Sequence, residues 1–388
     1  MNVRVKPHAT VVERDLPFEC IALVLQGGGA LGAYQAGVYE ALAEAGIYPD
    51  WVAGVSIGAI NCAIIAGNPP EARIEKLRGF WECITTNPWR SSFEWTNGPR
   101  GDAARAWQNQ LHAGLAVIAG TAGFFAPRYP PSWLYPSGTA NATSFYDTRQ
   151  LKDTLERFVD FDRLNAGAIR LSIGAVNVRS GNFVYFDSQT HTIGPEHIMA
   201  SGALPPGFPP IEIEGEHYWD GGLVSNTPLQ WIVESRPRLD TLAFQVDLWS
   251  ARGALPRSLA EVSTRQKDIQ YSSRTRAGTD SFKRIQRLRR AAADLLDKLP
   301  DDLRRSPEAA LLRNVVDRKV YNIAHLIYRA KNYEGPAKDY EFSRESMEEH
   351  WRAGYYDAVH TLRHPEVVGR PANDAGVFTF DLAVDGRE

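Results

Sequence analysis

The chain has 388 residues, of which 44% are hydrophobic and 23% are charged. These values are typical of globular proteins, so they exclude a disordered, collagenous or coiled-coil chain. The 43 basic and 46 acidic side chains leave a formal charge of −3, which gives no global electrostatic reason to bind nucleic acid. The three cysteines form no C-x-x-C pair, so they indicate neither a disulfide framework nor a thiolate zinc site and favour a reducing compartment.

Neither a classical export signal nor a membrane-spanning helix is predicted. Charged side chains interrupt the first residues of the chain, where a signal peptide needs an unbroken apolar stretch. The longest nearly apolar run, residues 114–126, is shorter than the roughly 20 residues that a spanning helix requires. We therefore expect a cytoplasmic protein that is soluble or bound peripherally at the inner face of the membrane.

The first part of the chain contains two predicted strand–turn–helix units. An apolar strand is expected over residues 21–25, followed by three glycines and by a helix over 31–42 whose apolar positions recur every three or four residues. The pattern repeats with a strand over 51–55 and an apolar helix over 57–66. This order predicts an α/β fold with a mostly parallel sheet.

Further elements continue this pattern toward residue 250, where we expect the sheet to end. Strands are predicted over residues 169–176, 183–186 and 242–248, and a helix should begin at Pro228 after an N-cap at Thr227.

Residues 54–58 match the G-x-S-x-G pattern of a nucleophile elbow, with Ser56 at the turn between a predicted strand and helix. Gly54 and Gly58 leave room for the turn and for an approaching ester, and the positive end of the following helix favours an oxyanion. The alternative is a glycine-rich turn that serves only to pack a helix.

Three consecutive glycines, Gly27, Gly28 and Gly29, follow the first predicted strand. Successive backbone N–H groups without a Cβ can bind the oxyanion of a tetrahedral intermediate. The same residues fit the G-x-G-x-x-G dinucleotide fingerprint, with Gly32 as its last glycine and Asp50 as the acidic residue near the end of a second strand.

A third feature favours acyl transfer over dinucleotide binding. Asp220, Gly221 and Gly222 lie between two aromatic residues and an Asn-Thr-Pro sequence, so the carboxylate is positioned rather than merely solvated. A dinucleotide site gives no role to this aspartate or to Ser56, whereas an acyl-transfer site uses all three features.

With these motifs in this order, residues 20–250 resemble the patatin-like phospholipases. The resemblance implies a three-layer α/β/α fold with a mostly parallel central sheet. It implies Ser56 as the nucleophile, Asp220 as its partner in a Ser-Asp dyad, and residues 27–29 as the oxyanion loop. We expect no cofactor, and the sequence contains no metal-ligand motif. One departure is Leu31, which stands where many members of the family have Arg or Lys.

The resemblance also implies hydrolysis of fatty acyl esters, of the phospholipase A or lysophospholipase type, with phospholipid or lysophospholipid as substrate. Three alternatives stay open: an esterase for soluble short-chain or hydroxyalkanoate esters, a non-enzymatic nucleotide-binding protein, and a catalytically silent scaffold. A conventional triad is the mechanistic competitor, and its histidine would follow the acid in the chain. The candidates are His325, His350, His360 and His364.

We expect residues 1–18 to form an N-terminal arm, residues 19–250 a catalytic domain, and residues 251–388 a mainly helical extension, with the oligomeric state left open. Residues 88–146, rich in Pro, Gly, Trp and Asn, are interpreted as an insertion into the catalytic domain. Its apolar stretch, residues 115–125, is either a lid or lipid-facing wall or a satellite core.

The predicted extension contains a strongly basic segment. Residues 274–331 carry 15 basic and 7 acidic side chains. Their amphipathic helix either packs its apolar stripe on a core or brings the protein to anionic lipid head groups. The predicted stripe consists of Phe282, Ile285, Leu288, Ala292, Leu295 and Leu299. A later helix should begin near Ser346 and run to Leu362.

Overall fold

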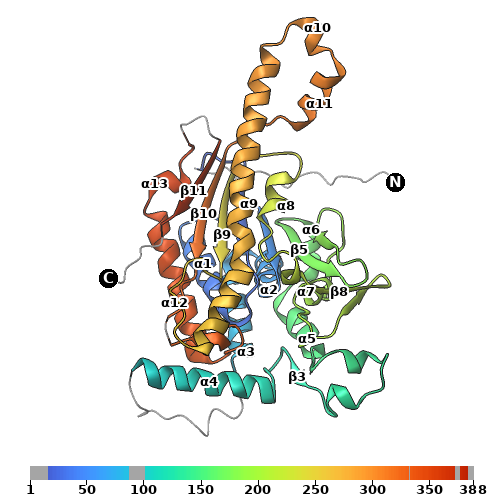
Figure 1. Cartoon of the computed structure of the whole chain (residues 1–388), viewed down its shortest axis with the longest axis vertical. Coiled ribbons are helices and arrows are strands. Elements are labelled where there is room, and N and C mark those ends of the chain that lie inside the picture. Colours follow the sequence, from blue (N-terminus) through green and yellow to red (C-terminus); the bar gives the residue numbers. More distant parts are fainter. Residues whose placement is uncertain (1–15, 87–100, 332, 372–375, 383–388) are drawn as a thin grey trace.

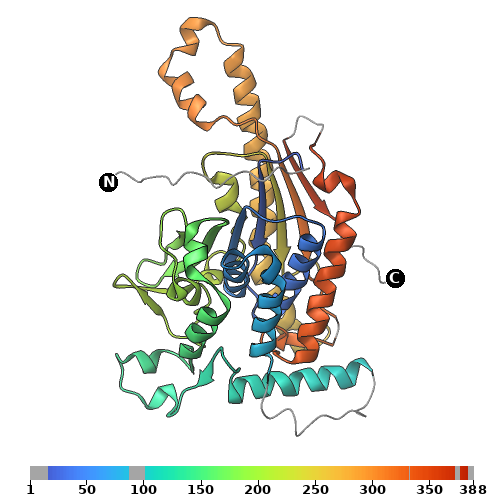
Figure 2. The same ribbon diagram turned by 180° about the vertical axis from the view of Figure 1, so that it is seen from behind.

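The computed structural model describes residues 16–86, 101–331, 333–371 and 376–382. Most of the expected N-terminal arm and the start of the expected insertion lie outside these ranges. Within them, nine strands form one sheet in the order β11-β10-β9-β1-β2-β5-β8-β7, with β6 also paired to β5 (Figures 1 and 2). The fold is therefore α/β, as predicted.

The sheet is parallel except at one side. The parallel strands are β1 (Cys20–Leu25), β2 (Trp51–Val55), β5 (Arg170–Asn177), β9 (Thr241–Asp247), β10 (Tyr321–Ile327) and β11 (Val377–Asp381). The antiparallel ones are β6 (Phe183–Asp187), β7 (Ile211–Ile213) and β8 (Glu216–Asp220). A separate two-stranded ribbon consists of β3 (Ala126–Pro127) and β4 (Tyr146–Asp147).

The described residues form α-helices that cover both faces of the sheet or extend beyond its ends (Figure 1). They are α1 (Ala33–Glu44), α2 (Ile57–Ala66), α3 (Arg73–Ile84), α4 (Asp102–Ala119), α5 (Arg149–Phe158), α6 (Phe161–Ala166), α7 (Pro195–Ser201), α8 (Leu229–Glu234), α9 (Leu259–Asp297), α10 (Asp301–Arg304), α11 (Pro307–Val315), α12 (Arg344–Leu362) and α13 (Pro365–Val368).

Strand β1 shows why the chain folds into three layers. Ile21, Leu23 and Leu25 belong to the core shared with α1, α2, α3 and α12. The alternate residues of the same strand belong to a second core, shared with α8 and α9. A central parallel strand is buried on both faces, which explains its continuous apolar sequence.

The predicted strand 51–55 and helix 57–66 match β2 and α2 residue for residue. The predicted helix at Pro228 begins instead at Leu229, with Pro228 as its N-cap. The hydroxyl group of Thr227 accepts a hydrogen bond from Gln26 Nε2 and faces Asp247. Helix α12 begins at Arg344, close to the expected start at Ser346, and its N-cap Ser343 accepts a hydrogen bond from the Ser346 N–H.

The expectation that the sheet ends near residue 250 is wrong. Strand β10 pairs with β9 and β11 pairs with β10, so two strands from the C-terminal region extend the sheet. The physical reason is that β9 is buried on both faces and needs a further neighbour on its outer edge. The rest of residues 251–388 is mainly helical, as predicted.

The predicted stripe of the basic helix is only partly right. Phe282 is buried in α9, but Ile285, Leu288 and Leu295 are exposed. The upper part of α9 projects beyond the sheet and forms a helical hairpin with α10 and α11 (Figure 1). There α9 contacts α11, and Gln286 donates a hydrogen bond to the Lys319 carbonyl at 3.0 Å. The buried side includes Gln286, Ala293 and Leu296.

The C-terminal helix α12 packs on α1 at backbone distance. A Cβ at Gly354 would lie 1.9 Å from the carbonyl oxygen of Tyr34, and one at Gly37 would lie 1.9 Å from that of Trp351. The Tyr34 hydroxyl also donates to Asp357 at 2.7 Å. Two facing glycines therefore fix the position of α12.

Replacing Gly354 with alanine should lower the free energy of unfolding by at least about 2 kcal/mol, because the two helices must separate. Gly278 of α9 is the matched control, since no described atom lies within 4 Å of the position of its Cβ. Gly278→Ala should raise stability by up to about 1 kcal/mol, because alanine favours a helix. Urea unfolding measures both changes, and equal stability of the two variants would contradict this packing.

Candidate active site

Ser56 lies at the turn between β2 and α2, with φ 56° and ψ −126°. This is a strained conformation for a residue with a side chain, and such strain marks functional turns. The Ser56 N–H donates to Ser201 Oγ at 2.9 Å, and that hydroxyl donates to the Gly174 carbonyl at 2.7 Å. Ser201, which sequence reasoning did not assign, holds the elbow in place.

The two glycines of the G-x-S-x-G motif are required by packing. A Cβ at Gly58 would lie 2.3 Å from the carbonyl oxygen of Leu25, at the end of β1. One at Gly54 would lie 2.5 Å from the backbone of Gly58. The first turn of α2 therefore packs against the strands without any intervening side chain.

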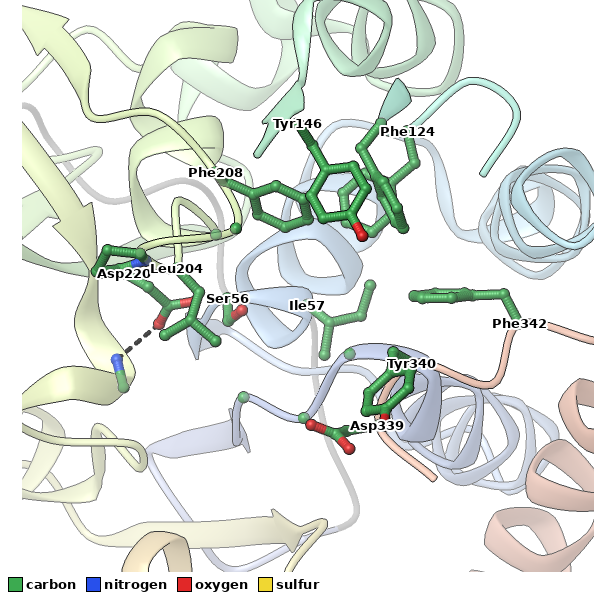
Figure 3. Close-up of a pocket in the computed structure, with 18 of the residues that line it drawn as sticks. Ser56, Ile57, Phe124, Tyr146, Leu204, Phe208, Asp220, Asp339, Tyr340 and Phe342 are labelled. Atoms are coloured by element: carbon green, nitrogen blue, oxygen red, sulfur yellow. Dashed lines mark hydrogen bonds between the residues drawn. The ribbon is translucent and has the colours of Figure 1, made fainter. Parts of the chain in front are cut away.

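Asp220 is the last residue of β8, which pairs with β5 next to β2. The topology thus brings its carboxyl group beside Ser56, and Figure 3 shows the two side chains at one end of a cavity that both line. Asp220 accepts a hydrogen bond from the Gly222 N–H at 2.7 Å. Burial raises the pKa of Asp220 to about 6, while hydrogen bonding from the Ser56 side chain and the Gly222 N–H opposes this shift.

The residues after Asp220 hold the carboxyl group in the sheet. A Cβ at Gly221 would lie 2.6 Å from the carbonyl oxygen of Gly174 in β5. At Gly222, a Cβ would lie 3.0 Å from Asp220 Oδ1 and 3.1 Å from Asn226 Oδ1. A side chain at either glycine would therefore displace β8 or the carboxyl group.

The glycine loop offers two backbone donors rather than the three that its sequence suggests. The Gly27 N–H already donates to the Asn226 carbonyl at 3.3 Å. The Gly27 carbonyl accepts from Asn226 Nδ2 at 3.0 Å and from Trp249 Nε1 at 2.9 Å. Because the peptide plane is rigid, the N–H of Gly28 points away from these donors. In the described parts of the chain, the N–H groups of Gly28 and Gly29 have no partner.

A segment from the C-terminal region fixes this loop. Gly29 has φ +56°, and a Cβ there would lie 2.1 Å from the carbonyl oxygen of Asp339. The same oxygen accepts a hydrogen bond from the Ala30 N–H at 2.8 Å. The Asp339 carboxylate is paired with Lys267 of α9 at 2.8 Å. The loop conformation therefore depends on residues beyond 250.

The cavity has a volume of about 350 Å³ and combines a polar end with an apolar wall. Ser56, Asp220 and the glycine loop form the polar end, and aromatic rings from distant parts of the chain form the wall (Figure 3). The rings lie 4.9–6.2 Å apart between centroids. They are Phe124, Phe125, Tyr146, Phe208 and Phe342.

The predicted apolar stretch of residues 115–125 is divided between surface and cavity. Leu115 is exposed, whereas Phe124 and Phe125 are buried and line the cavity. Sequence reasoning missed the contributions of the C-terminal region, which are Tyr271, Asp339, Tyr340 and Phe342. No motif marks the aromatic residues among them, because an apolar wall requires only large hydrophobic side chains.

The rival sites are not assembled. No histidine of the described chain lines the cavity. His325 faces Asp247 at 3.7 Å and His350 faces Glu334 at 3.4 Å, and neither lines the cavity that contains Ser56. His360 and His364 lie against each other near the end of α12.

Asp50 does not face the glycine loop. It precedes β2, and its carboxylate accepts a hydrogen bond from the Ile21 N–H at the start of β1. The glycine loop follows the opposite ends of these parallel strands. The structure thus separates the two halves of the dinucleotide fingerprint.

The described helices include none that is long and apolar enough to cross a bilayer. This agrees with the hydropathy of the sequence.

Comparisons with known proteins match both halves of the chain. The family model of patatin-like phospholipases matches residues 23–230, and a second one, described as patatin phospholipase, matches residues 269–374. The first match covers Ser56, Asp220 and the glycine loop. The second includes Tyr271 and Phe342 of the cavity wall.

Among curated proteins, lysophospholipase NTE1 of Saccharomyces cerevisiae is 26% identical over 251 residues, 63% of this chain and 12% of that protein. Patatin-like phospholipase domain-containing protein 7 of Rattus norvegicus is 27% identical over 219 residues, 55% of this chain and 13% of that protein. The chain thus matches only a small part of these much longer relatives.

Among solved structures, the crystal structure of VipD from Legionella pneumophila aligns with a TM-score of 0.40 and 17% identity, over 89% of this chain and 67% of that one. The family assignment does not depend on this alignment, since the first family model alone covers more than half of the chain. The chain belongs to the patatin-like phospholipase family.

Proposed function

We propose that this chain hydrolyses acyl esters of lipids, with Ser56 as the nucleophile and Asp220 as the base. The observation that carries the proposal is the shared cavity, in which the strained serine, the buried carboxyl group and two unpartnered backbone N–H groups lie at one end. Family membership gives the substrate class, and the names of the relatives include lysophospholipases.

Each step uses a group at the polar end. Asp220 accepts the Ser56 proton as the hydroxyl oxygen attacks the ester carbonyl, and the N–H groups of Gly28 and Gly29 stabilise the resulting oxyanion. Collapse of this intermediate expels the alcohol, which takes the proton from Asp220, and leaves an acyl-enzyme on Ser56. Asp220 then deprotonates a water molecule that attacks the acyl-enzyme. Collapse of this second intermediate releases the fatty acid, and Ser56 recovers the proton from Asp220.

The apolar wall favours a fatty acyl chain over a short soluble acyl group. Five aromatic rings and Val117 of α4 line the cavity, and burial of an acyl chain against the rings contributes about 0.8 kcal/mol per methylene. We infer that the activity is of the phospholipase A or lysophospholipase type, with phospholipid or lysophospholipid as substrate. A soluble short-chain ester fills only the polar end.

The test measures fatty acid release from phosphatidylcholine, lysophosphatidylcholine and p-nitrophenyl butyrate, with Ser56→Ala as the control. We expect higher kcat/KM for a long-chain lipid than for the butyrate, and no activity in the variant. Hydrolysis of the butyrate alone would support the short-chain esterase instead. Lipid hydrolysis that persists in Ser56→Ala would overturn the proposed nucleophile.

The pH dependence of kcat/KM should report the ionisation of Asp220. Burial raises its pKa to about 6, so kcat/KM should fall about tenfold per pH unit below pH 6 and level off above pH 7. A carboxyl group ionises with almost no enthalpy change, whereas the ionisation enthalpy of imidazole is large. Heating should therefore leave the midpoint of the pH profile in place. A midpoint that moves strongly with temperature would point to a histidine.

A further inference from the structure

Helix α4 presents its apolar side chains outward. Trp107, Leu111, Leu115 and Ile118 are exposed, and their spacing places them in one stripe along the helix. Ile118 is 77% exposed. A surface helix of a soluble protein normally turns such a stripe toward the core, so this orientation needs an explanation.

The inner face of α4 buries Asn109 together with the small residues Ala113 and Ala116, and charged side chains hold it in place. Arg105 pairs with Glu345 and with Glu349 of α12. His112 lies 3.5 Å from Glu341, whose side chain is buried. These contacts orient the helix, so its outward apolar stripe is built into the fold.

A second segment adds apolar side chains at the same end of the molecule. Residues 128–145 connect β3 to β4 and lie beside α4 at the lower end of Figures 1 and 2. Its exposed residues include Trp133 at 73% and Leu134 at 66%. The apolar end of the molecule comprises Trp107, Leu111, Leu115, Ile118, Tyr129, Trp133, Leu134 and Phe145.

The apolar end is continuous with the cavity. Val117 of α4 is half exposed and also lines the cavity. Tyr146 also lines the cavity, and its hydroxyl group donates a hydrogen bond to the Val117 carbonyl at 2.8 Å. Leu204, partly exposed, lines the cavity close to Ser56 (Figure 3). A path of apolar contacts therefore leads from the surface to the proposed nucleophile.

We propose that the apolar end docks on a lipid surface and that an acyl chain enters the cavity from it. The inference rests on the proposed function, which requires an acyl lipid to reach Ser56. Tryptophan and tyrosine rings are suited to the boundary between water and acyl chains. A protein partner or a second copy on this end would cover the cavity entrance, whereas a lipid surface supplies the substrate there.

This docking is hydrophobic rather than electrostatic. The residues of the apolar end carry no charge, and the basic hairpin of α9, α10 and α11 projects from the opposite end of the molecule (Figure 1). Contact through the apolar end should therefore resist salt and require no anionic lipid. Contact through the hairpin would require both low salt and anionic head groups.

The experiment sediments the full chain with vesicles of pure phosphatidylcholine at low and high salt. We expect binding at both salt concentrations, and Ile118→Glu combined with Trp133→Glu should weaken it at least about tenfold. The control combines Leu288→Glu with Leu311→Glu, because these side chains are 64% and 70% exposed on the hairpin. The control should bind as the unmodified chain does.

Three results would overturn the inference. They are unchanged binding by the first pair, lost binding by the hairpin pair, and binding only to anionic vesicles at low salt. Size-exclusion chromatography tests whether the apolar end binds a second copy of the chain instead. The inference is also overturned if the unmodified chain is a dimer, the Ile118→Glu and Trp133→Glu variant is a monomer, and the two bind vesicles equally.

Hydrolysis of p-nitrophenyl butyrate separates this inference from the proposed function. Neither Ile118 nor Trp133 lines the cavity, so the first pair should hydrolyse this soluble ester normally and lose activity on vesicles. If neither the unmodified chain nor any variant hydrolysed p-nitrophenyl butyrate or a lipid ester, the proposed function would be wrong. Equal vesicle hydrolysis by the first pair and the unmodified chain would defeat the docking surface alone.

Discussion

Replacing Asp220 with asparagine should lower kcat for ester hydrolysis by about 10³ to 10⁴-fold, because the amide cannot take the Ser56 proton. The amide oxygen can still accept the hydrogen bond from the Gly222 N–H, so the turn should keep its geometry. The measurement is kcat on a soluble ester at pH 8. Asp50→Asn is the control, since that carboxylate lies at the opposite edge of the sheet and bonds to the Ile21 N–H.

The same substitution should stabilise the protein. The pKa of Asp220 is raised from 3.8 to about 6, so the folded state binds the proton more tightly than the unfolded state does. This contribution is fully present below pH 4 and is lost as the pH rises through 6, a difference of about 3 kcal/mol. Asp220→Asn should therefore raise the melting temperature at pH 8 and change it little at pH 4. Full activity in this variant would refute the proposed base.

Gly29→Ala should lower kcat by about 10² to 10³-fold, which is the usual effect of losing an oxyanion donor. The new Cβ would lie 2.1 Å from the Asp339 carbonyl oxygen, and Gly29 has a positive φ. The loop must move, so the N–H groups of Gly28 and Gly29 lose their positions in the cavity that these residues line together with Ser56. KM for a long-chain lipid should change little, because the aromatic wall that binds its acyl chain is intact.

Gly46→Ala separates this effect from backbone strain. Gly46 also has a positive φ, +72°, but no described atom lies within 4 Å of the position of its Cβ, and it follows α1 far from the cavity. Both substitutions carry the cost of a left-handed backbone, about 1 kcal/mol, and Gly29→Ala adds the clash with the Asp339 carbonyl oxygen. Only Gly29→Ala should lose turnover. An equal loss of kcat in both variants would show that the loop has no special part in catalysis.

The parts of the fold that the sequence predicts are those with strong local signals. Strand β2 and helix α2 meet at a G-x-S-x-G turn. The apolar sequences on both sides and the glycines of the turn together predict a strand–turn–helix unit. The approach of Asp220 to Ser56 follows from family resemblance rather than from spacing. Strand β8 reaches the serine only because it pairs with β5, which is a long-range contact.

The remaining features arise from contacts that no local pattern encodes. Strand β10 is placed by pairing with the edge of β9, and β11 by pairing with β10, rather than by a local signal in their own sequences. The apolar stripe of α4 points outward because Arg105 and His112 find acidic partners near and on α12. Gln286 is buried in α9 where Leu288 is exposed, since the hairpin sets which side of the helix is covered.

The most direct test of the account is labelling with a fluorophosphonate, followed by peptide mapping. Such a probe reacts only with an activated serine, so modification should occur at Ser56, accelerate as the pH rises through about 6, and fall sharply in Asp220→Asn. An unmodified Ser56 in a preparation that hydrolyses lipid, or equal labelling in Asp220→Asn, would contradict the central claim that these two side chains form the catalytic pair.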